Sequence, residues 1–388
     1  MNTIADIVVG TIRAQICGKP YHIAGEITDD VLNETYTFSR AQDMAHLVAA
    51  ELLSQQAIQN AEMKGLFKKQ QILAVYRYER INREYTDICR VLEANEIPYM
   101  PLKGSVMRQY YPEPWMRTSA DIDILVPKNQ VEIAAEALVR ELNYCNEGAF
   151  EHDVQMATPS GVQFELHFDT IEDYQLEKAN KVLANIWEEH AVCAEGHRYV
   201  MSEEMFYFYH VAHMAKHFTN GGCGIRFFLD MWLLNHNTDY DHKKRMALLK
   251  AGDLYEFAKH AEQLSEVWFG DRTHTDVTER MERHILNGGV YGGQENAMAV
   301  QSAHHGGKLG YAMYLVFRPL HELRRTYTIL YKHKWLYPFC QVHRWFKLIF
   351  KSGISHISGI LHRGAAAYEK NGDSVEQMLW DLKLAKNK

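Results

Sequence analysis

The chain has 388 residues, which is enough for two or three domains with sizeable cores. Hydrophobic residues make up 47% and charged residues 23%, as in an ordinary globular protein. A formal net charge of −7 argues against a protein that coats nucleic acid with a generally basic surface, although it leaves room for a local basic face.

The sequence shows no sign of export or of membrane insertion. The first twenty residues carry Asp6 within their apolar part and have no basic leader, so no signal peptide is expected. No run of 18 or more apolar residues occurs, so no stable membrane insertion is expected. The six cysteines are scattered without a Cys-x-x-Cys pair, which is typical of reduced thiols. We therefore expect a cytoplasmic protein.

The pattern of apolar residues changes near residue 95. Before that point they recur at three- and four-residue steps between charged faces, which predicts helices. Residues 97–103 are expected to be extended, because their two prolines exclude a helix interior. A strand over 121–126, a helix over 129–144 and two strands within 151–169 follow, the last two joined by the turn sequence Thr-Pro-Ser-Gly. This order predicts a small α/β unit.

The rest of the chain is predicted to be mostly helical, with interruptions at 196–204 and at the Gly-rich 219–224. We predict an α+β protein with an α/β catalytic core. Three segments are expected: an N-terminal helical region (1–90), the core (91–175) and a larger C-terminal helical region (176–388).

Two aspartates in the strand 121–126 suggest a metal site. Side chains alternate along a strand, so Asp121 and Asp123 share one face while Ile122 and Ile124 point to the core. Two carboxylates this close repel each other unless a cation neutralises them, and Mg²⁺ typically binds one or two carboxylates together with substrate phosphates.

The second strand of the hairpin offers a third carboxylate. Gln163, Glu165 and His167 share one face of that strand. If it lies beside 121–126, Glu165 joins the two aspartates. Three carboxylates can hold two metal ions about 3.5–4 Å apart, an arrangement that suits phosphoryl displacement.

Gly104 and Ser105 stand where the extended segment turns into a short helix. Glycine allows close approach of the backbone to a ligand, and the first N–H groups of a helix can bind an anion. Lys103 and Ser105 add hydrogen-bond donors.

These motifs together resemble a known superfamily. LKGS (102–105), DID about sixteen residues later and a Glu on a later strand resemble the DNA polymerase β-like nucleotidyltransferases over residues 97–170. More narrowly, FELHF, HMAKHF…IRFFLD and NGGVYGGQEN are similar to a bacterial family of uncharacterised nucleotidyltransferases. The resemblance implies a polymerase β-like core with a mixed sheet, and transfer of a nucleoside monophosphate from an NTP to an acceptor.

The resemblance also implies a role for each residue of the motif. Gly104 and Ser105 would hold the β- and γ-phosphates. Asp121 and Asp123 would bind both Mg²⁺ (or Mn²⁺) ions. Glu165 would bind the catalytic ion and help to deprotonate the acceptor hydroxyl. Charge and position add Lys103 and Arg117 as phosphate contacts.

A histidine-rich helix is a further candidate. His210, His213 and His217 fall on one helical face, so a zinc site is conceivable, although no carboxylate or thiolate ligand is adjacent and Lys216 would oppose a cation. In the resembling family this segment is a hallmark. Two readings stay open: Lys216, His217 and Arg226 contact the triphosphate or acceptor, with Asp230 orienting Arg226, or all four form an internal scaffold.

The last section is basic and aromatic. Arg344, Lys347 and Lys351 are expected on one helical face, and Val342 and Phe346 are among the apolar residues of another. The favoured interpretation is a helix whose apolar side packs in a core; docking on an anionic membrane or on RNA is the alternative.

Three functions stay open at this point. The first is a nucleotidyltransferase whose acceptor is a small molecule, a protein hydroxyl or an RNA end. The second is an inactive module of the same fold that senses a nucleotide or regulates a partner. The third is a protein that binds RNA or membrane through its basic tail. The oligomeric state cannot be read from the sequence.

Overall fold

The computed structural model describes residues 3–23, 27–149, 152–170 and 176–385. The chain divides into two compact units. Unit 1 consists of Met1–Met214 and Ile225–His274, and unit 2 of Ala215–Gly224 and Thr275–Lys388. The units follow spatial packing, whereas the three segments 1–90, 91–175 and 176–388 follow changes along the sequence and stay a prediction.

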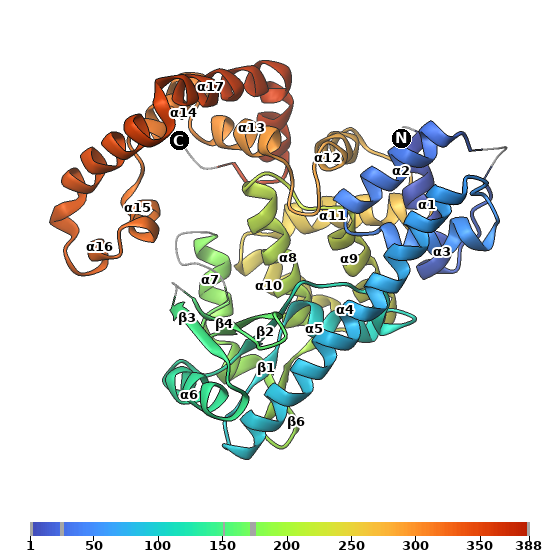
Figure 1. The fold of residues 1–388 in the computed structure, drawn as a ribbon, viewed down its shortest axis with the longest axis horizontal. Helices are drawn as coiled ribbons and strands as arrows, with labels where there is room; N and C mark the ends of the chain where they lie inside the picture. The colour runs from blue at the N-terminus through green and yellow to red at the C-terminus, as the bar shows by residue number, and fades with distance from the viewer. Residues whose placement is uncertain (1–2, 24–26, 150–151, 171–175, 386–388) are drawn as a thin grey trace. The chain divides into compact units, whose positions relative to one another are not determined.

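Unit 1 begins with the predicted helices. These are α1 (Thr3–Cys17), α2 (Asp29–Ala41), α3 (Ala45–Ser54) and the long α4 (Ala61–Ala94) (Figure 1). Polar side chains cap the N-termini of α2 and α4. The Thr28 hydroxyl accepts a hydrogen bond from a backbone N–H of α2, and the Asn60 side chain accepts two from backbone N–H groups of α4. Such caps satisfy N–H groups that have no partner within the helix.

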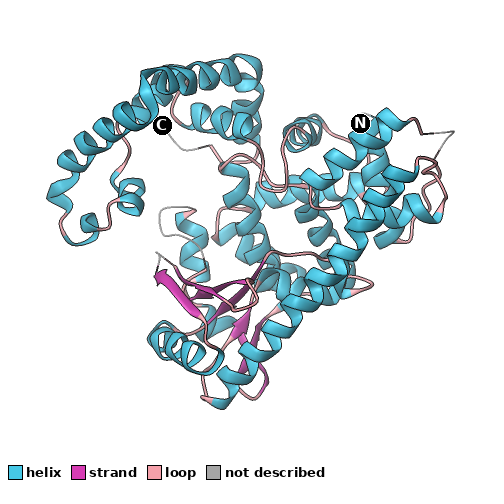
Figure 2. Cartoon of the chain, in the orientation of Figure 1, coloured by secondary structure: helices cyan, strands magenta, loops and turns pink. Residues whose placement is uncertain are grey.

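Unit 1 contains a five-stranded mixed sheet (Figure 2). Its strands are β1 (Met100–Pro101), β2 (Asp121–Leu125), β3 (Cys145–Ala149), β4 (Asp153–Ala157) and β5 (Gln163–His167), in the order β1-β2-β5-β4-β3. The pair β2–β5 is parallel and the other pairs are antiparallel. The predicted hairpin is confirmed, with Gly161 at φ +79° in its turn. The α+β class with a mixed sheet is confirmed.

The sheet has one apolar and one polar face. Ile122, Ile124, Phe164 and Leu166 are buried with residues of α4 and of α6 (Val131–Leu142) in one core cluster. Alternate residues of the same strands, including both aspartates, therefore point to the other face. Figure 1 shows α4 and α6 beside the sheet.

Three strands were not predicted. β3 is the sequence CNEGA, which is largely exposed and lacks an alternating apolar pattern. β6 (Ala191–Glu195) and β7 (Arg198–Met201) form a separate two-stranded sheet in a region that was expected to be helical apart from 196–204. Their side chains are mostly exposed or half-buried, so burial leaves little periodic signal in the sequence.

Helices complete unit 1. A short α5 (Lys103–Met107) follows β1, and α7 (Glu177–Leu183) follows β5 along the chain. α8 (Glu203–Thr219) begins in unit 1, and its residues from Ala215 onward belong to unit 2. α9 (Ile225–Asn237), α10 (His242–Ala251) and α11 (Tyr255–Trp268) form the remainder.

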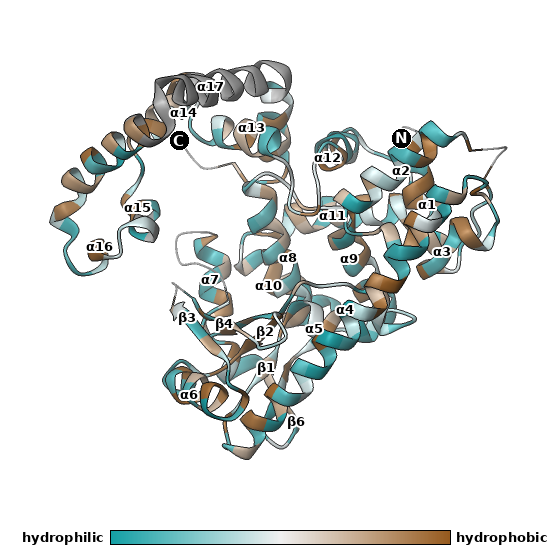
Figure 3. Cartoon of the chain, in the orientation of Figure 1, coloured by the Kyte–Doolittle hydropathy of each residue, from teal (hydrophilic) through white to brown (hydrophobic). Residues whose placement is uncertain are grey.

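The described elements of unit 2 are largely helical: α12 (Asp276–Leu286), α13 (Gln294–His304), α14 (Lys308–Val316), α15 (Leu320–Thr326), α16 (Ile329–Lys332) and α17 (Tyr337–Asp381). Hydrophobic and hydrophilic positions alternate along the first part of α17 (Figure 3). The expectation that this apolar side packs in a core is wrong for Val342 and Phe346, which are 43% and 56% exposed. Within the described residues, no helix combines the length and the apolar character needed to cross a bilayer.

Candidate functional site

The register between β2 and β5 brings the three predicted carboxylates together. Asp123 lies directly opposite Glu165, and Asp121 opposite Gln163, in a parallel pair. Residues that face each other in neighbouring strands point to the same side of a sheet. Asp121, Asp123 and Glu165 therefore share the polar face, as expected if the second hairpin strand neighbours 121–125.

Lys103 extends into this group of acids. Its Nζ lies 2.6 Å from Asp123 Oδ1 and 3.7 Å from Glu165 Oε2. Lys103 adopts a left-handed backbone conformation (φ +45°), which residues other than Gly, Asn and Asp rarely adopt. Lys103 thus combines an unfavourable backbone conformation with a partly buried ion pair, at the junction of β1 and α5.

His167 completes the group, although the sequence suggested no role for it. Its Nε2 lies 2.9 Å from Asp123 Oδ1 and 3.2 Å from Glu165 Oε2, and the side chain is 1% exposed. The alternation of β5 had placed His167 on this face, but only the parallel pairing with β2 shows that it contacts the carboxylates. We call Lys103, Asp121, Asp123, Glu165 and His167 the acid cluster.

Charge is unbalanced within the acid cluster. Burial raises the pKa of Asp121 to about 6, and the negative charge of Asp123 adds to this effect. Burial would also raise the pKa of Asp123, but the Lys103 ammonium and the hydrogen bond from His167 hold it below its usual range. The pKa of Lys103 is raised, because Asp123 and other acidic groups outweigh its burial. Lys103 and His167 thus compensate the negative charge of Asp123, whereas the negative charge of Asp121 is not compensated within the protein.

Gly104 and Ser105 lie next to the acid cluster in sequence, at the start of α5. A Cβ atom on Gly104 would stand 3.2 Å from the Ser119 Cβ, so the backbone packs closely against Ser119 here. The helix has only five residues, and its macrodipole is correspondingly small. Phosphate binding by Gly104 and Ser105 stays a prediction.

Tyr209 on α8 was missed by the sequence analysis. The side chain is 1% exposed, and its hydroxyl has no hydrogen-bond partner among the described residues. Burial raises the pKa of Tyr209, and Lys103, Asp123 and Glu165 are among the charges that act on it. The electrostatic interaction of this buried hydroxyl with the acid cluster could not be predicted from the sequence, because Tyr209 lies within a helix that is apolar on most sides.

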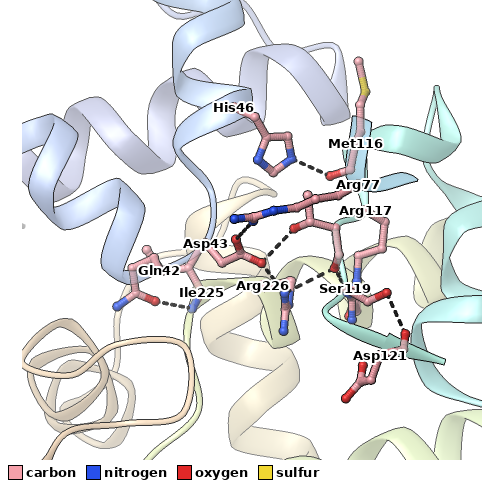
Figure 4. A network of polar contacts seen from close by, with 12 residues as sticks. Gln42, Asp43, His46, Arg77, Met116, Arg117, Ser119, Asp121, Ile225 and Arg226 are labelled. Atoms are coloured by element: carbon pink, nitrogen blue, oxygen red, sulfur yellow. Dashed lines mark hydrogen bonds and ion pairs between the residues drawn. The ribbon is translucent and has the colours of Figure 1, made fainter. Parts of the chain in front are cut away.

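Arg117 and Arg226 are paired with carboxylates, and Figure 4 shows the pair of Arg226 with Asp43. Arg117 is 6% exposed and donates three hydrogen bonds of 2.8–3.0 Å to Asp230. Arg226 donates to Asp43 Oδ2 at 2.7 Å. Asp230 thus accepts hydrogen bonds from Arg117 and from the Tyr111 hydroxyl, the latter at 2.7 Å. The expected partner of Asp230 was Arg226. We call Asp43, Arg117, Arg226 and Asp230 the arginine network.

The arginine network holds the segment that leads into β2. Thr118 donates from its hydroxyl to Asp43 and accepts from both arginines at its carbonyl oxygen. His46 contacts the Met116 carbonyl oxygen at 2.8 Å, and Ser119 donates to the Asp121 carbonyl oxygen at 3.1 Å (Figure 4). The internal scaffold is therefore the reading that the contacts favour for Arg226 and Asp230, while phosphate contacts by the two arginines stay a prediction.

The histidines of α8 do not assemble as a metal site in the structure. His210 Nε2 lies 3.0 Å from the Phe227 carbonyl oxygen, and burial lowers the pKa of His210. Neither group of potential metal ligands among the described residues includes His210, His213 or His217. Lys216 and His217 belong to unit 2, where His217 contacts the Tyr291 ring, and their predicted nucleotide contacts stay untested.

A comparison with known protein families finds a match over the part of the chain that contains the site. A family model described as "Uncharacterised nucleotidyltransferase" matches residues 32–270, which is more than half of the chain. The chain belongs to this family. The match runs from α2 to α11 and includes both the acid cluster and the arginine network. No curated protein and no solved structure matches the chain significantly.

Proposed function

We propose that this member of the nucleotidyltransferase family is an active, Mg²⁺-dependent enzyme. It transfers a nucleoside monophosphate from an NTP to a hydroxyl or phosphate acceptor and releases pyrophosphate. The observation that carries the proposal is the pairing of Asp123 with Glu165 on adjacent parallel strands, with Asp121 on the same face. All three acids of the superfamily pattern are therefore present and adjacent.

The side chains of the acid cluster fit a divalent cation. Ligand atoms of Asp123, Glu165 and His167 lie within 4.8 Å of one another, and the raised pKa of Asp121 reflects burial and excess negative charge. Asp121, Asp123 and Glu165 would hold Mg²⁺ or Mn²⁺ through oxygen atoms, which these ions prefer. When bound, the ion supplies positive charge that neutralises the carboxylates and polarises the phosphoryl group.

The residues of the chain then have separate tasks. The Glu165 side chain is 26% exposed, so it can reach an acceptor hydroxyl and accept its proton. The acceptor oxygen forms a bond to the α-phosphorus, the bond between this phosphorus and the α,β-bridging oxygen breaks, and pyrophosphate leaves. Lys103, as a cation beside the acids, can donate to a phosphate oxygen, and Gly104 and Ser105 can bring backbone N–H groups close to it.

The first experiment is thermal unfolding with ATP, GTP, CTP or UTP, each with and without Mg²⁺. A ligand that binds only the native state raises its apparent stability. We expect a Mg²⁺-dependent rise with at least one nucleotide, and no rise in Asp121→Asn. Binding without pyrophosphate release, tested with candidate small-molecule, protein and RNA acceptors, would instead select the inactive nucleotide-sensing module. No rise with any nucleotide would count against both.

A second candidate function concerns the first part of α17. Phe339, Val342, Phe346 and Phe350 are spaced so that they share one helical face, and they are 43–81% exposed. Residues 318–351 contain eight Lys and Arg and a single acid, Glu322. Exposed aromatic side chains beside basic ones suit the surface of an anionic membrane.

Vesicle sedimentation tests this candidate. We expect the chain to sediment with vesicles of anionic phospholipid and to remain in solution with zwitterionic ones. Phe346→Asp combined with Phe350→Asp should abolish sedimentation, whereas the matched change Ile72→Asp, at a 64% exposed position on α4, should not. Binding to RNA in place of vesicles would reject the membrane in favour of a nucleic-acid partner.

A further inference from the structure

A second group of metal-binding side chains lies on the polar face of the sheet, one strand away from the acid cluster. Asp153 on β4 is directly opposite His167 on β5, and His152 precedes Asp153. One ligand atom of each of these three residues lies within 4.8 Å of the other two. Asp121, Asp123 and Glu165 are not part of this group, so it shares no member with the predicted Mg²⁺ site, although His167 also belongs to the acid cluster.

Two buried polar atoms in this group lack a partner. Asp153 Oδ1 and His167 Nδ1 form no hydrogen bond with any described residue, although their side chains are 2% and 1% exposed. A buried polar atom without a partner costs about 1–3 kcal/mol, and most such atoms in native proteins are satisfied. Both atoms belong to a directly opposed cross-strand pair, so a single ligand between the two side chains can satisfy them together.

The other nitrogen of His167 identifies the kind of ligand. Nε2 lies at hydrogen-bond distance from Asp123 and Glu165, and two carboxylates can only accept, so Nε2 carries the proton. In the neutral ring Nδ1 then presents a lone pair. A metal-binding histidine almost always donates its other ring N–H to a carboxylate, a backbone carbonyl or water, which fixes the tautomer. His167 has the required hydrogen bonds at Nε2, and a metal ion that binds Nδ1 takes the place of any proton there.

We propose that His152, Asp153 and His167 bind a transition-metal ion of the Zn²⁺ type. Imidazole nitrogen and carboxylate oxygen are ligands that Zn²⁺ takes at about 2.0–2.2 Å, whereas Mg²⁺ prefers oxygen alone. Three protein ligands leave a coordination position for water or for a substrate group. Because His167 also contacts Asp123 and Glu165, this ion fixes the orientation of two carboxylates of the acid cluster. The proposal does not depend on nucleotidyl transfer.

Zinc binding by the full-length chain, without nucleotide, tests the site. Protein freed of metal is dialysed against Zn²⁺ in the presence of excess Mg²⁺, and bound zinc is measured by elemental analysis. We expect one tightly bound zinc per chain. Asp153→Asn and His152→Gln should each weaken binding at least tenfold, and Co²⁺ in place of Zn²⁺ should give visible absorption bands that both variants lose.

Three control variants keep the test specific. Gln155→Ala changes the neighbouring residue on the same face of β4, and His190→Gln removes a histidine outside the group, so both should bind zinc normally. Asp121→Asn should also retain zinc. Loss of zinc in Asp121→Asn, with retention in Asp153→Asn, would place the ion in the acid cluster and overturn the proposal. Absence of bound zinc in the unchanged protein would overturn it as well.

Discussion

The acid cluster and the arginine network are both charged and largely buried, yet they differ in charge balance. In the arginine network each guanidinium faces a carboxylate, Arg117 with Asp230 and Arg226 with Asp43. In the acid cluster three carboxylates share Lys103 and His167, and Asp121 retains a raised pKa. A balanced group can be stable by itself, whereas an unbalanced one gains from a further cation. We therefore propose that the arginine network serves as a scaffold and that the acid cluster carries the chemistry.

Removing an acid from the unbalanced group should affect chemistry most. We expect Glu165→Gln to lower turnover by about 10²–10⁴-fold, because an amide cannot accept the proton of the acceptor. Asp121→Asn should abolish turnover through loss of a metal ligand. Pyrophosphate release measures both effects, and thermal unfolding should show that neither variant is much less stable. A loss of stability without a loss of turnover would reverse the assignment of the two groups.

Removing an acid from the balanced group should instead affect stability. Asp230→Asn leaves Arg117 buried without its counter-ion, which typically costs about 3–5 kcal/mol of unfolding free energy. Tyr111→Phe removes one hydrogen bond to the same carboxylate and should cost less, about 1–3 kcal/mol. Denaturant unfolding measures both. Equal, small effects would mean that the ion pair does not hold α9 to the segment before β2.

Lys103 affects both the stability of the metal-free protein and its response to Mg²⁺, because it supplies the only lysine or arginine charge of the acid cluster. We expect Lys103→Met to destabilise the metal-free protein and to increase the stabilisation by Mg²⁺, since the carboxylates lose an internal cation that competes with the ion. Nucleotide affinity should fall. Lys178→Met, which breaks an exposed ion pair with Asp253, is the matched control and should change little. An unchanged response to Mg²⁺ in Lys103→Met would show that Lys103 does not compete.

The raised pKa of Asp121 predicts a pH dependence of the metal-free protein. The unfolded chain loses this proton near pH 4 and the folded chain near pH 6, so between these values the folded state binds more protons. Stability from this group therefore falls as pH rises from 4 to 6, and Mg²⁺ binding weakens as pH falls below 6. Thermal unfolding across this range should show both trends, and Asp121→Asn should remove them. The shift for Asp123 is downward, so its effect lies at lower pH.

The sequence was sufficient for features that depend on local periodicity. Alternation along 121–126 and 162–168 separated the acids from the core residues. The pairing of the two strands entered the prediction only as a condition, which the structure meets. The partner of Arg117 could not be predicted, because Asp230 lies 113 residues away on a different helix. The left-handed conformation of Lys103 had no signal either, since lysine rarely adopts it and the ion pair with Asp123 forms only after β1 and β2 pair.

Gly104 lies where the two groups meet, and its substitution should give the smallest effect. A Cβ added to Gly104 would stand 3.2 Å from the Ser119 Cβ and 3.9 Å from Arg117 Nη1. We expect Gly104→Ala to cost about 1 kcal/mol of unfolding free energy, because overpacking costs about 1–3 kcal/mol and the better helix propensity of alanine offsets part of it.

A double-mutant cycle with Ser119 separates this contact from other causes. Ser119→Gly removes the Cβ that the alanine would meet, so Gly104→Ala should cost less in that background, whereas Ser119→Ala keeps the Cβ and should leave the cost unchanged. Denaturant unfolding of the five variants and the parent chain provides the coupling free energy. A cost that is the same in all three backgrounds would show that α5 shifts to accommodate the methyl group, so that the contact with the Ser119 Cβ does not determine the cost of the substitution.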